Sequence, residues 1–203
     1  MNHLLPPWQP RNRFFAMRHG ESEANRLGLI VSGPESGVPG YGLSDTGREQ
    51  VRLSIVNDRQ LDADTLIYSS DFKRAVETAR IVHAQLGCHR PVETHEALRE
   101  RFFGEFDGGD HGYYQQVWEA DAREAGHTEH GVEAVTAVMA RVTALVRELD
   151  RAWQGRRILL VAHGDVLQIL QTAFQRQTPE RHRALAHLDT ADIRELVVYQ
   201  HPV

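Results

Sequence analysis

The sequence predicts an α/β protein, a three-layer α/β/α sandwich in which helices cover both faces of a mainly parallel sheet. Short apolar segments with the composition of buried strands alternate with longer segments of helical spacing, which is the pattern of such sheets. The clearest strands are residues 13–17 (RFFAM) and 157–162 (RILLVA), and each runs into a polar, glycine-containing turn. The 203 residues, 41% of them hydrophobic, suffice for one core. We therefore expect a single domain over residues 1–203, with residues 1–12 as an N-terminal tail.

The remaining elements follow in chain order. Ser44 can cap a helix over residues 45–61, because a serine hydroxyl accepts hydrogen bonds from the first turn of a helix. The apolar residues of 71–86 recur at helical spacing, and Pro179 suits the first turn of a short helix. The other expected elements are strands over 65–69, 92–95 and 193–199, helices over 113–125, 132–153 and 165–174, and loops over 31–42 and 100–112.

The charge balance and the cysteine content exclude several classes of protein. Lys and Arg number 23 against 28 Asp and Glu, a formal net charge of −5, so no overall basic field is available for nucleic acid or an anionic membrane. No stretch approaches the roughly 20 apolar residues of a membrane-spanning helix, and the first residues lack the apolar core of a secretory signal. The single cysteine, Cys88, excludes an internal disulfide. We expect a cytoplasmic protein with neither nucleic acid nor membrane as a partner.

Two of the 12 histidines directly follow predicted strands. His19 comes after residues 13–17, and His163 comes after 157–162. Ligands of such sheets bind at the carboxyl ends of the strands, so the two rings would share one crevice if the strands are neighbours. The alternative is that each histidine merely caps its strand. Five other histidines lie in polar surroundings and are expected at the surface: His83, His89, His182, His187 and His201.

Arginine and glutamate near the same strand ends suit phosphate chemistry. Arg18 precedes His19, and Arg74 opens the helix expected over 71–86. A guanidinium presents fork-shaped donors that match phosphate oxygens, and a helix N-terminus adds positive potential. Glu100 lies in a glycine-rich loop, and a phosphate dianion nearby would raise its pKa and make it a proton donor. Taken singly, Arg74 and Glu100 could each be an exposed surface charge.

Several blocks of the chain together carry a family pattern. They are residues 18–25 (RHGESEAN), 43–47 (LSDTG), 69–79 (SSDFKRAVETA), 98–100 (LRE) with Gly104 and Gly108, and 161–164 (VAHG). In this order and at these separations they resemble the histidine phosphatase superfamily, in the branch similar to cofactor-dependent phosphoglycerate mutases. The resemblance extends from Phe14 to about Tyr199.

The resemblance implies a catalytic role for five residues. His19 would be the nucleophile and form a phosphohistidine that water then hydrolyses. To attack it must be neutral, so its other ring nitrogen should donate to a backbone carbonyl. Arg18, Arg74 and His163 would hold the phosphoryl oxygens, and Glu100 would protonate the leaving oxygen and later help to activate water. Neither a metal nor a cofactor is implied.

The resemblance also implies substrate-binding positions. Asn25 and Gly164 would lie at the phosphate or the substrate, and Arg101 matches a position that helps mutases bind substrate; an exposed loop arginine is the alternative for Arg101. Asp165 does not directly follow the second histidine, as the proton donor of the acid-phosphatase branch does, so Glu100 is favoured as the acid. Trp118 could form a wall of the substrate site, but its helical spacing favours a place in the core.

The functional prediction is a metal-independent phosphomonoesterase acting on a small phosphorylated metabolite. Mutases of the resembled branch carry a long basic insertion over the active site, whereas residues 102–140 contain one permanent cation, Arg123. The alternatives are a phosphoglycerate mutase-type phosphotransferase, a metal site built on His19, His163 and Glu100, and a catalytically silent protein that binds a phosphorylated ligand. No residue selects one substrate, and a homodimer is one possible assembly.

Overall fold

The computed structural model describes residues 1–199 and has one five-stranded sheet at its centre, in the order β3-β2-β4-β1-β5. The strands are β1 (Arg13–Arg18), β2 (Leu66–Ser69), β3 (Glu93–Thr94), β4 (Arg157–Ala162) and β5 (Ile193–Leu196). β1 and β2 both pair parallel with β4, and β3 pairs parallel with β2, whereas β5 is antiparallel to β1 at one edge. This is the mainly parallel sheet that the sequence predicts.

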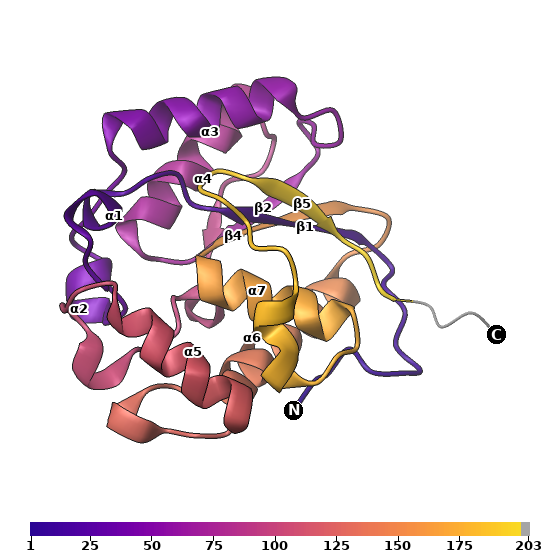
Figure 1. Cartoon of the computed structure of the whole chain (residues 1–203). Coiled ribbons are helices and arrows are strands. Elements are labelled where there is room, and N and C mark those ends of the chain that lie inside the picture. The colour runs from indigo at the N-terminus through magenta and orange to yellow at the C-terminus, as the bar shows by residue number, and fades with distance from the viewer. Residues whose placement is uncertain (200–203) are drawn as a thin grey trace.

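Helices cover both faces of the sheet. Figure 1 shows α3 and α4 on one side, and α6 and α7, with α5 beyond them, on the other. The α-helices are α1 (Glu23–Leu27), α2 (Pro34–Gly37), α3 (Asp45–Asn57), α4 (Lys73–Leu86), α5 (Tyr113–Arg123), α6 (Val135–Ala152) and α7 (Gly164–Phe174). Short 3₁₀ helices are η1 (Glu96–Leu98), η2 (Gly104–Phe106), η3 (Glu129–Gly131) and η4 (Pro179–Ala184). The three-layer arrangement is thus confirmed.

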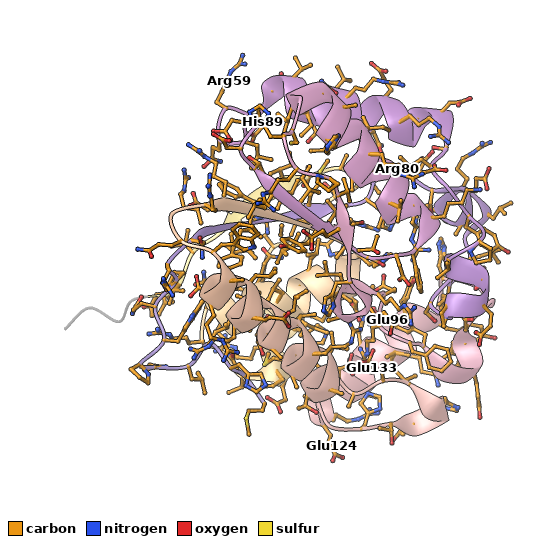
Figure 2. The ribbon with its side chains drawn as sticks, turned by 180° about the vertical axis from the view of Figure 1, so that it is seen from behind. Arg59, Arg80, His89, Glu96, Glu124 and Glu133 are labelled. Carbon is orange, nitrogen blue, oxygen red and sulfur yellow. The ribbon has the colours of Figure 1, made fainter. Side chains whose placement is uncertain are left out.

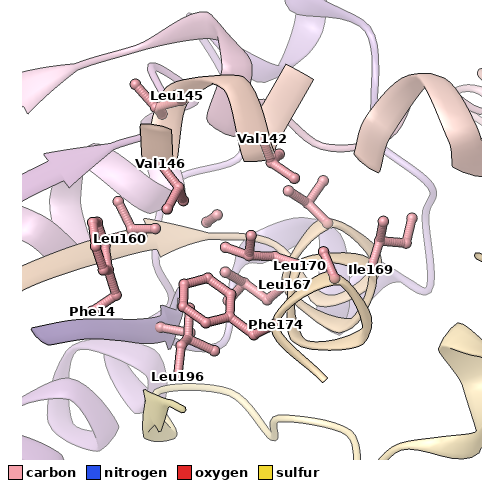
Figure 3. Close-up of a cluster of buried hydrophobic side chains, with 14 of the residues drawn as sticks. Phe14, Val142, Leu145, Val146, Leu160, Leu167, Ile169, Leu170, Phe174 and Leu196 are labelled. Atoms are coloured by element: carbon pink, nitrogen blue, oxygen red, sulfur yellow. The ribbon is translucent and has the colours of Figure 1, made fainter. Parts of the chain in front are cut away.

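The alternation of side chains along the strands divides the core into two halves. In β1, Phe14 and Ala16 belong to the cluster packed under α6 and α7, whereas Phe15 and Met17 point to the side of α3 and α4. β4 alternates in the same way and is buried along nearly its whole length, as a central parallel strand must be. Figure 3 shows Phe14 and Leu160 packed against side chains of α6 and α7.

Two helices differ from the predicted bounds by three or more residues, because other hydrogen bonds engage the backbone at their ends. α3 begins after Ser44, whose hydroxyl accepts from Gly47 N as expected, but it ends at Asn57 rather than at residue 61. The Asp58 carboxylate there accepts from the backbone N–H groups of residues 60 and 61, which turns the chain out of the helix. α6 begins at Val135 rather than at residue 132 because Glu133 N donates to Phe102 O in the neighbouring loop.

The first 12 residues contain no regular element but pack on the domain, so the expectation of a tail is corrected. Leu4 and Trp8 are buried in the cluster of α6 and α7. Trp8 Nε1 donates to Asp150 Oδ2 at 3.1 Å, and Asn12 Nδ2 donates to Asp150 Oδ1 at 3.0 Å. This segment therefore closes one end of the core.

Most charged side chains lie at the surface. In Figure 2, Arg59, Arg80 and His89 project from the half that contains α3 and α4, and Glu124 and Glu133 lie in the opposite half. Within residues 1–199, no helix is long and apolar enough to cross a membrane.

Among the histidines expected at the surface, His182 is wrongly placed, because it is fully buried. His89 and His187 are exposed and His83 is half-buried. His201 lies outside the described residues.

Candidate active site

A pocket of about 290 Å³ opens where β1 and β4 end. Its lining comes from the turns after both strands, from α4, from the loop around residue 100 and from α5. The lining residues are Arg18, His19, Ser22, Ala24, Asn25, Leu29, Val31, Arg74, Glu100, His111, Tyr114, Trp118, Gly164, Asp165 and His187.

The two histidines meet because their strands are neighbours. Arg18 is paired with Ala162 in the register of β1 and β4, and His19 N donates to Ala162 O at 3.1 Å. The imidazole rings of His19 and His163 follow directly, with centroids 5.2 Å apart. Both side chains are almost completely buried. The two rings therefore meet as predicted, but only His19 belongs to the lining of the pocket.

The hydrogen bonds of His19 define its tautomer. Its Nε2 accepts from Arg74 Nε at 3.1 Å, because a guanidinium can only donate. The proton must then lie on Nδ1, which donates to Gly20 O at 2.7 Å. Burial, then the charges of Arg74 and Arg18, hold the pKa of His19 well below its usual range. His19 is thus a neutral imidazole with the Nε2 lone pair toward the arginine, the state that a nucleophile requires.

His163 is fixed by the strand and helix on its other side. Its Nε2 lies 2.9 Å from Ser70 Oγ, in the turn after β2, and its ring meets Phe72 edge-on. Burial and the charge of Arg74 keep its pKa well below the usual value. The remaining nitrogen, Nδ1, is buried and has no partner among the described residues.

The two guanidinium groups of the pocket lining each have one buried N–H without a partner among the described residues. Arg74 is held by His19 and by Val31 O, at 2.9 Å from its Nη2, and its Nη1 has no partner in the described chain. Arg18 is held through Nη1 by His187 Nε2 at 2.8 Å and by Leu188 O at 3.1 Å, and its Nε is likewise unpaired. Buried donors without an acceptor are costly. Their presence around His19 indicates a site built for an oxyanion.

Glu100 is poised to donate a proton at neutral pH. Burial, then the negative charge of Asp165, raises its pKa to about 7, against the opposing charge of Arg74. Its Oε1 accepts from Arg101 N at 2.9 Å, which fixes the carboxyl group at the pocket. The group is therefore protonated in about half of the molecules near pH 7.

Asp165 also lines the pocket but is held as an anion. Burial alone would raise its pKa, but the charges of Arg101 and Arg183 outweigh it, and the pKa is lowered. Trp118 Nε1 donates to Asp165 Oδ1 at 3.0 Å. An ionised carboxylate engaged in this way is no proton donor, which supports Glu100 as the acid.

Arg101 does not lie where substrate binding was expected. Its side chain is fully buried and is absent from the pocket lining. Its Nη1 and Nη2 donate to the two oxygens of Asp121 at 2.6 and 2.7 Å, and its Nε donates to Glu133 O at 2.6 Å. A further contact of 3.2 Å joins it to Asp165. Arg101 is instead an internal cation that ties α5 to α7 and to the loop before α6.

Trp118 lies in the pocket wall and not in the core, contrary to the prediction. Its ring stacks on Tyr114, with centroids 5.4 Å apart and planes inclined by 6°. The guanidinium carbon of Arg183 lies 3.6 Å from its centroid. Helical spacing alone does not distinguish a face that packs on the core from one that lines a cavity.

The two other predicted binding residues do lie at the pocket. Asn25 is exposed at the mouth, and its Oδ1 accepts from Ser22 N in the cap of α1. Gly164 begins α7, and a Cβ there would lie 3.1 Å from the ring of His187 and 3.5 Å from the Arg18 guanidinium. Glycine at this position therefore lets the side chains of His187 and Arg18 pack closely against the start of α7.

Comparison with known proteins assigns this site to a family. The model of the histidine phosphatase superfamily (branch 1) matches residues 14–202. The chain belongs to this superfamily. As a histidine phosphatase superfamily member it is an enzyme, with phosphatases and mutases both among its relatives.

Three relatives are 26–29% identical to it over the aligned residues. A 2,3-bisphosphoglycerate-dependent phosphoglycerate mutase of Cytophaga hutchinsonii is 29% identical over 86% of this chain and 81% of the relative. A metal-independent phosphoserine phosphatase of Arabidopsis thaliana is 26% identical over 76% of this chain and 65% of its own length. The structure of a mycobacterial glucosyl-3-phosphoglycerate phosphatase in complex with VO3 has a TM-score of 0.75, at 27% identity, covering 90% of this chain and 91% of that one.

Proposed function

We propose that the protein is a metal-independent phosphomonoesterase that hydrolyses a small phosphorylated metabolite through a phosphohistidine on His19. The observation that carries the proposal is the state of His19, a neutral buried imidazole whose Nε2 faces Arg74. Unpaired buried N–H groups of Arg18 and Arg74 surround it. These groups suit the three oxygens of a transferring phosphoryl group better than those of a neutral ligand.

In the first step, His19 Nε2 attacks phosphorus and the bond from phosphorus to the ester oxygen breaks. Glu100 transfers its proton to that oxygen, so the leaving group departs as a neutral alcohol. Arg18 and Arg74 stabilise the negative charge on the phosphoryl oxygens, and His163 completes the ring of groups around them. The Nδ1–H bond to Gly20 O stabilises the positive charge that develops on the His19 ring.

In the second step, water hydrolyses the phosphohistidine. The Glu100 carboxylate accepts a proton from water as its oxygen bonds to phosphorus and the N–P bond breaks. Inorganic phosphate and neutral His19 result, and Glu100 regains its proton. One carboxyl group with a pKa of about 7 serves in both steps, because it is readily converted between acid and base.

A metal-dependent reaction at the same residues is disfavoured by the charges around them. Arg74 lies 3.1 Å from His19 Nε2 and occupies the side from which a cation would be bound. Within residues 1–199, no group of three His, Cys, Asp or Glu is arranged to hold a metal ion.

Hydrolysis is favoured over a mutase reaction by the lack of cations over the pocket. A mutase must retain a bisphosphorylated intermediate, which needs a second phosphate site. Arg123, the one permanent cation of residues 102–140, is exposed at the end of α5 and does not line the pocket. The alcohol is therefore released after the first step, and water accepts the phosphoryl group in the second. We further propose that the enzyme acts in the cytoplasm.

The products of the reaction test this assignment. Chelator-treated protein is mixed with phenyl phosphate, and separately with 3-phosphoglycerate and a 2,3-bisphosphoglycerate primer. We expect inorganic phosphate to be released from phenyl phosphate and no 2-phosphoglycerate to form in the second mixture. Primer-dependent isomerisation would identify a mutase, and phenyl phosphate that binds without turnover would identify a silent binding protein.

A further inference from the structure

One wall of the pocket consists of aromatic and apolar side chains. Leu29, Tyr114 and Trp118 form much of it, with Ala24 at one side. Trp118 and Tyr114 lie parallel, and Phe103 meets Tyr114 edge-on with centroids 4.8 Å apart. This column of rings extends from the buried core to the pocket, so the wall is already formed and needs no rearrangement to receive a ligand.

The permanent charges of the lining are distributed unequally. Both cations, Arg18 and Arg74, are beside His19, where the phosphoryl group is proposed to lie. Of the two carboxyl groups in the lining, Asp165 lies beside the aromatic wall, where it accepts from Trp118 Nε1, and Glu100 interacts electrostatically with both Asp165 and Arg74. A leaving group in the pocket therefore meets two acids, and no arginine or lysine lines the pocket besides Arg18 and Arg74, which are proposed to hold the phosphoryl group.

Two further arginines contact residues of this wall or Asp165, and both are already engaged. Arg101 is buried against Asp121 and Asp165. Arg183 lies over Trp118, and its Nη1 contacts Asp165 Oδ1 at 3.3 Å as well as Gln168 Oε1. Neither belongs to the pocket lining. Turning either one into the pocket would leave Asp165 buried with less compensation, which is costly.

From this arrangement we infer that the enzyme selects phosphomonoesters whose leaving alcohol is uncharged and has an apolar or aromatic face, and discriminates against leaving groups that carry a carboxylate. The inference rests on the proposed phosphatase function and specifies its substrate class. An uncharged group gains contact with Tyr114 and Trp118. A carboxylate would lose water without gaining a partner and would lie near Asp165. The selectivity proposed here differs from that implied by the word phosphoglycerate in the names of two relatives, since glycerate is a carboxylate.

The test compares two substrates that differ by one charge, 4-(carboxymethyl)phenyl phosphate and its amide, 4-(carbamoylmethyl)phenyl phosphate. The methylene group insulates the phenol, so the leaving groups have similar intrinsic reactivity. We expect kcat/KM to favour the amide by at least about tenfold, which corresponds to one unpaired, partly desolvated charge. His19 labelling is measured with both substrates in the same experiment.

Two lysine variants add a charge inside and outside the pocket. His111 lines the pocket with an exposed side chain, so His111→Lys places a cation at the wall. The preference for the amide should then fall at least about threefold. Gln115→Lys adds the same charge to α5 at an exposed position outside the pocket and should leave the preference unchanged.

The outcomes separate the two proposals. Phosphohistidine formation with equal rates for the two substrates, or with a preference for the acid, overturns the selectivity and leaves the phosphatase standing. An equal shift in both lysine variants shows that long-range charge, not the wall, sets the preference, and this also overturns it. No label and no hydrolysis with either substrate refutes the proposed function, and the selectivity falls with it.

Discussion

Replacing Glu100 by glutamine should stabilise the fold while it removes the proton donor. In the folded protein the pKa of Glu100 is raised to about 7, mainly by burial, against 4.5 for the free side chain. A raised pKa means that the folded state holds its proton more tightly than the unfolded state does. The contribution of Glu100 to stability is then greatest below pH 4.5, falls as pH rises from 4.5 to 7, and stays low above 7.

The size of the effect follows from the same pKa. A rise in the pKa of Glu100 from 4.5 to about 7 corresponds to about 3 kcal/mol of unfolding free energy. Because the side chain is partly exposed, the expected effect is about 1–3 kcal/mol. Glu100→Gln has no charge to bury, so it should gain this amount at pH 8. The amide can still accept from Arg101 N, so the local hydrogen bond is kept.

Denaturant unfolding of both proteins at pH 8 and pH 4.5 measures the gain. It should be present at pH 8 and absent at pH 4.5. Glu96→Gln is the control, since Glu96 is exposed and precedes Glu100 in the same segment. A Glu100→Gln protein that is less stable than wild type at pH 8, or equally stabilised at both pH values, would refute the reasoning.

Three further predictions concern the pH dependence, the buried ion pair and the arginine at the pocket. The first compares hydrolysis of an alkyl phosphate, which needs a proton donor, with that of an aryl phosphate, which does not. The ratio of the alkyl rate to the aryl rate should fall about tenfold per pH unit above 7, because Glu100 ionises. A ratio that does not change with pH in stopped assays contradicts this. Arg101→Met should lower the free energy of unfolding in urea by about 3–5 kcal/mol, because it leaves Asp121 buried without the arginine. A decrease below 1 kcal/mol would be inconsistent with the ion pair. His187→Ala should raise KM about tenfold with little change in kcat, because Arg18 loses a hydrogen-bond acceptor, and His187→Gln should restore KM. Equal KM values for wild type and His187→Ala in steady-state assays would show that His187 does not position Arg18.

Much of the fold could be predicted from local patterns. The strand over 157–162 was predicted with the bounds of β4, because a central parallel strand is a continuous apolar run between polar turns. α4 ends at Leu86, where predicted, because Gly87 adopts the left-handed conformation that ends a helix. α3 was predicted too long because periodicity does not show that the Asp58 side chain competes for the backbone.

The prediction placed His19 at the pocket from its strand end, and Arg74 and Glu100 from the family pattern. It failed for two side chains on a loop and a helix, Arg101 and Trp118. His19 and His163 meet because the register of two strands brings them together. Arg101 was misplaced because a loop can turn a guanidinium inward as readily as outward. One signal was present: Asp121 falls four residues after Val117 on the buried face of α5, and a carboxylate there requires a buried cation. His187 comes from an irregular segment, and no motif pointed to its contact with Arg18.

The central claim is that the phosphoryl group passes through His19. Chelator-treated wild type and His19→Ala are mixed with 32P-labelled phenyl phosphate in a rapid-quench apparatus, and the protein is analysed for acid-labile, base-stable label. We predict label on wild type, formed at least as fast as turnover, and neither label nor turnover with His19→Ala. Phosphate release that continues in His19→Ala, or that ceases in wild type when metal is removed, would contradict the account.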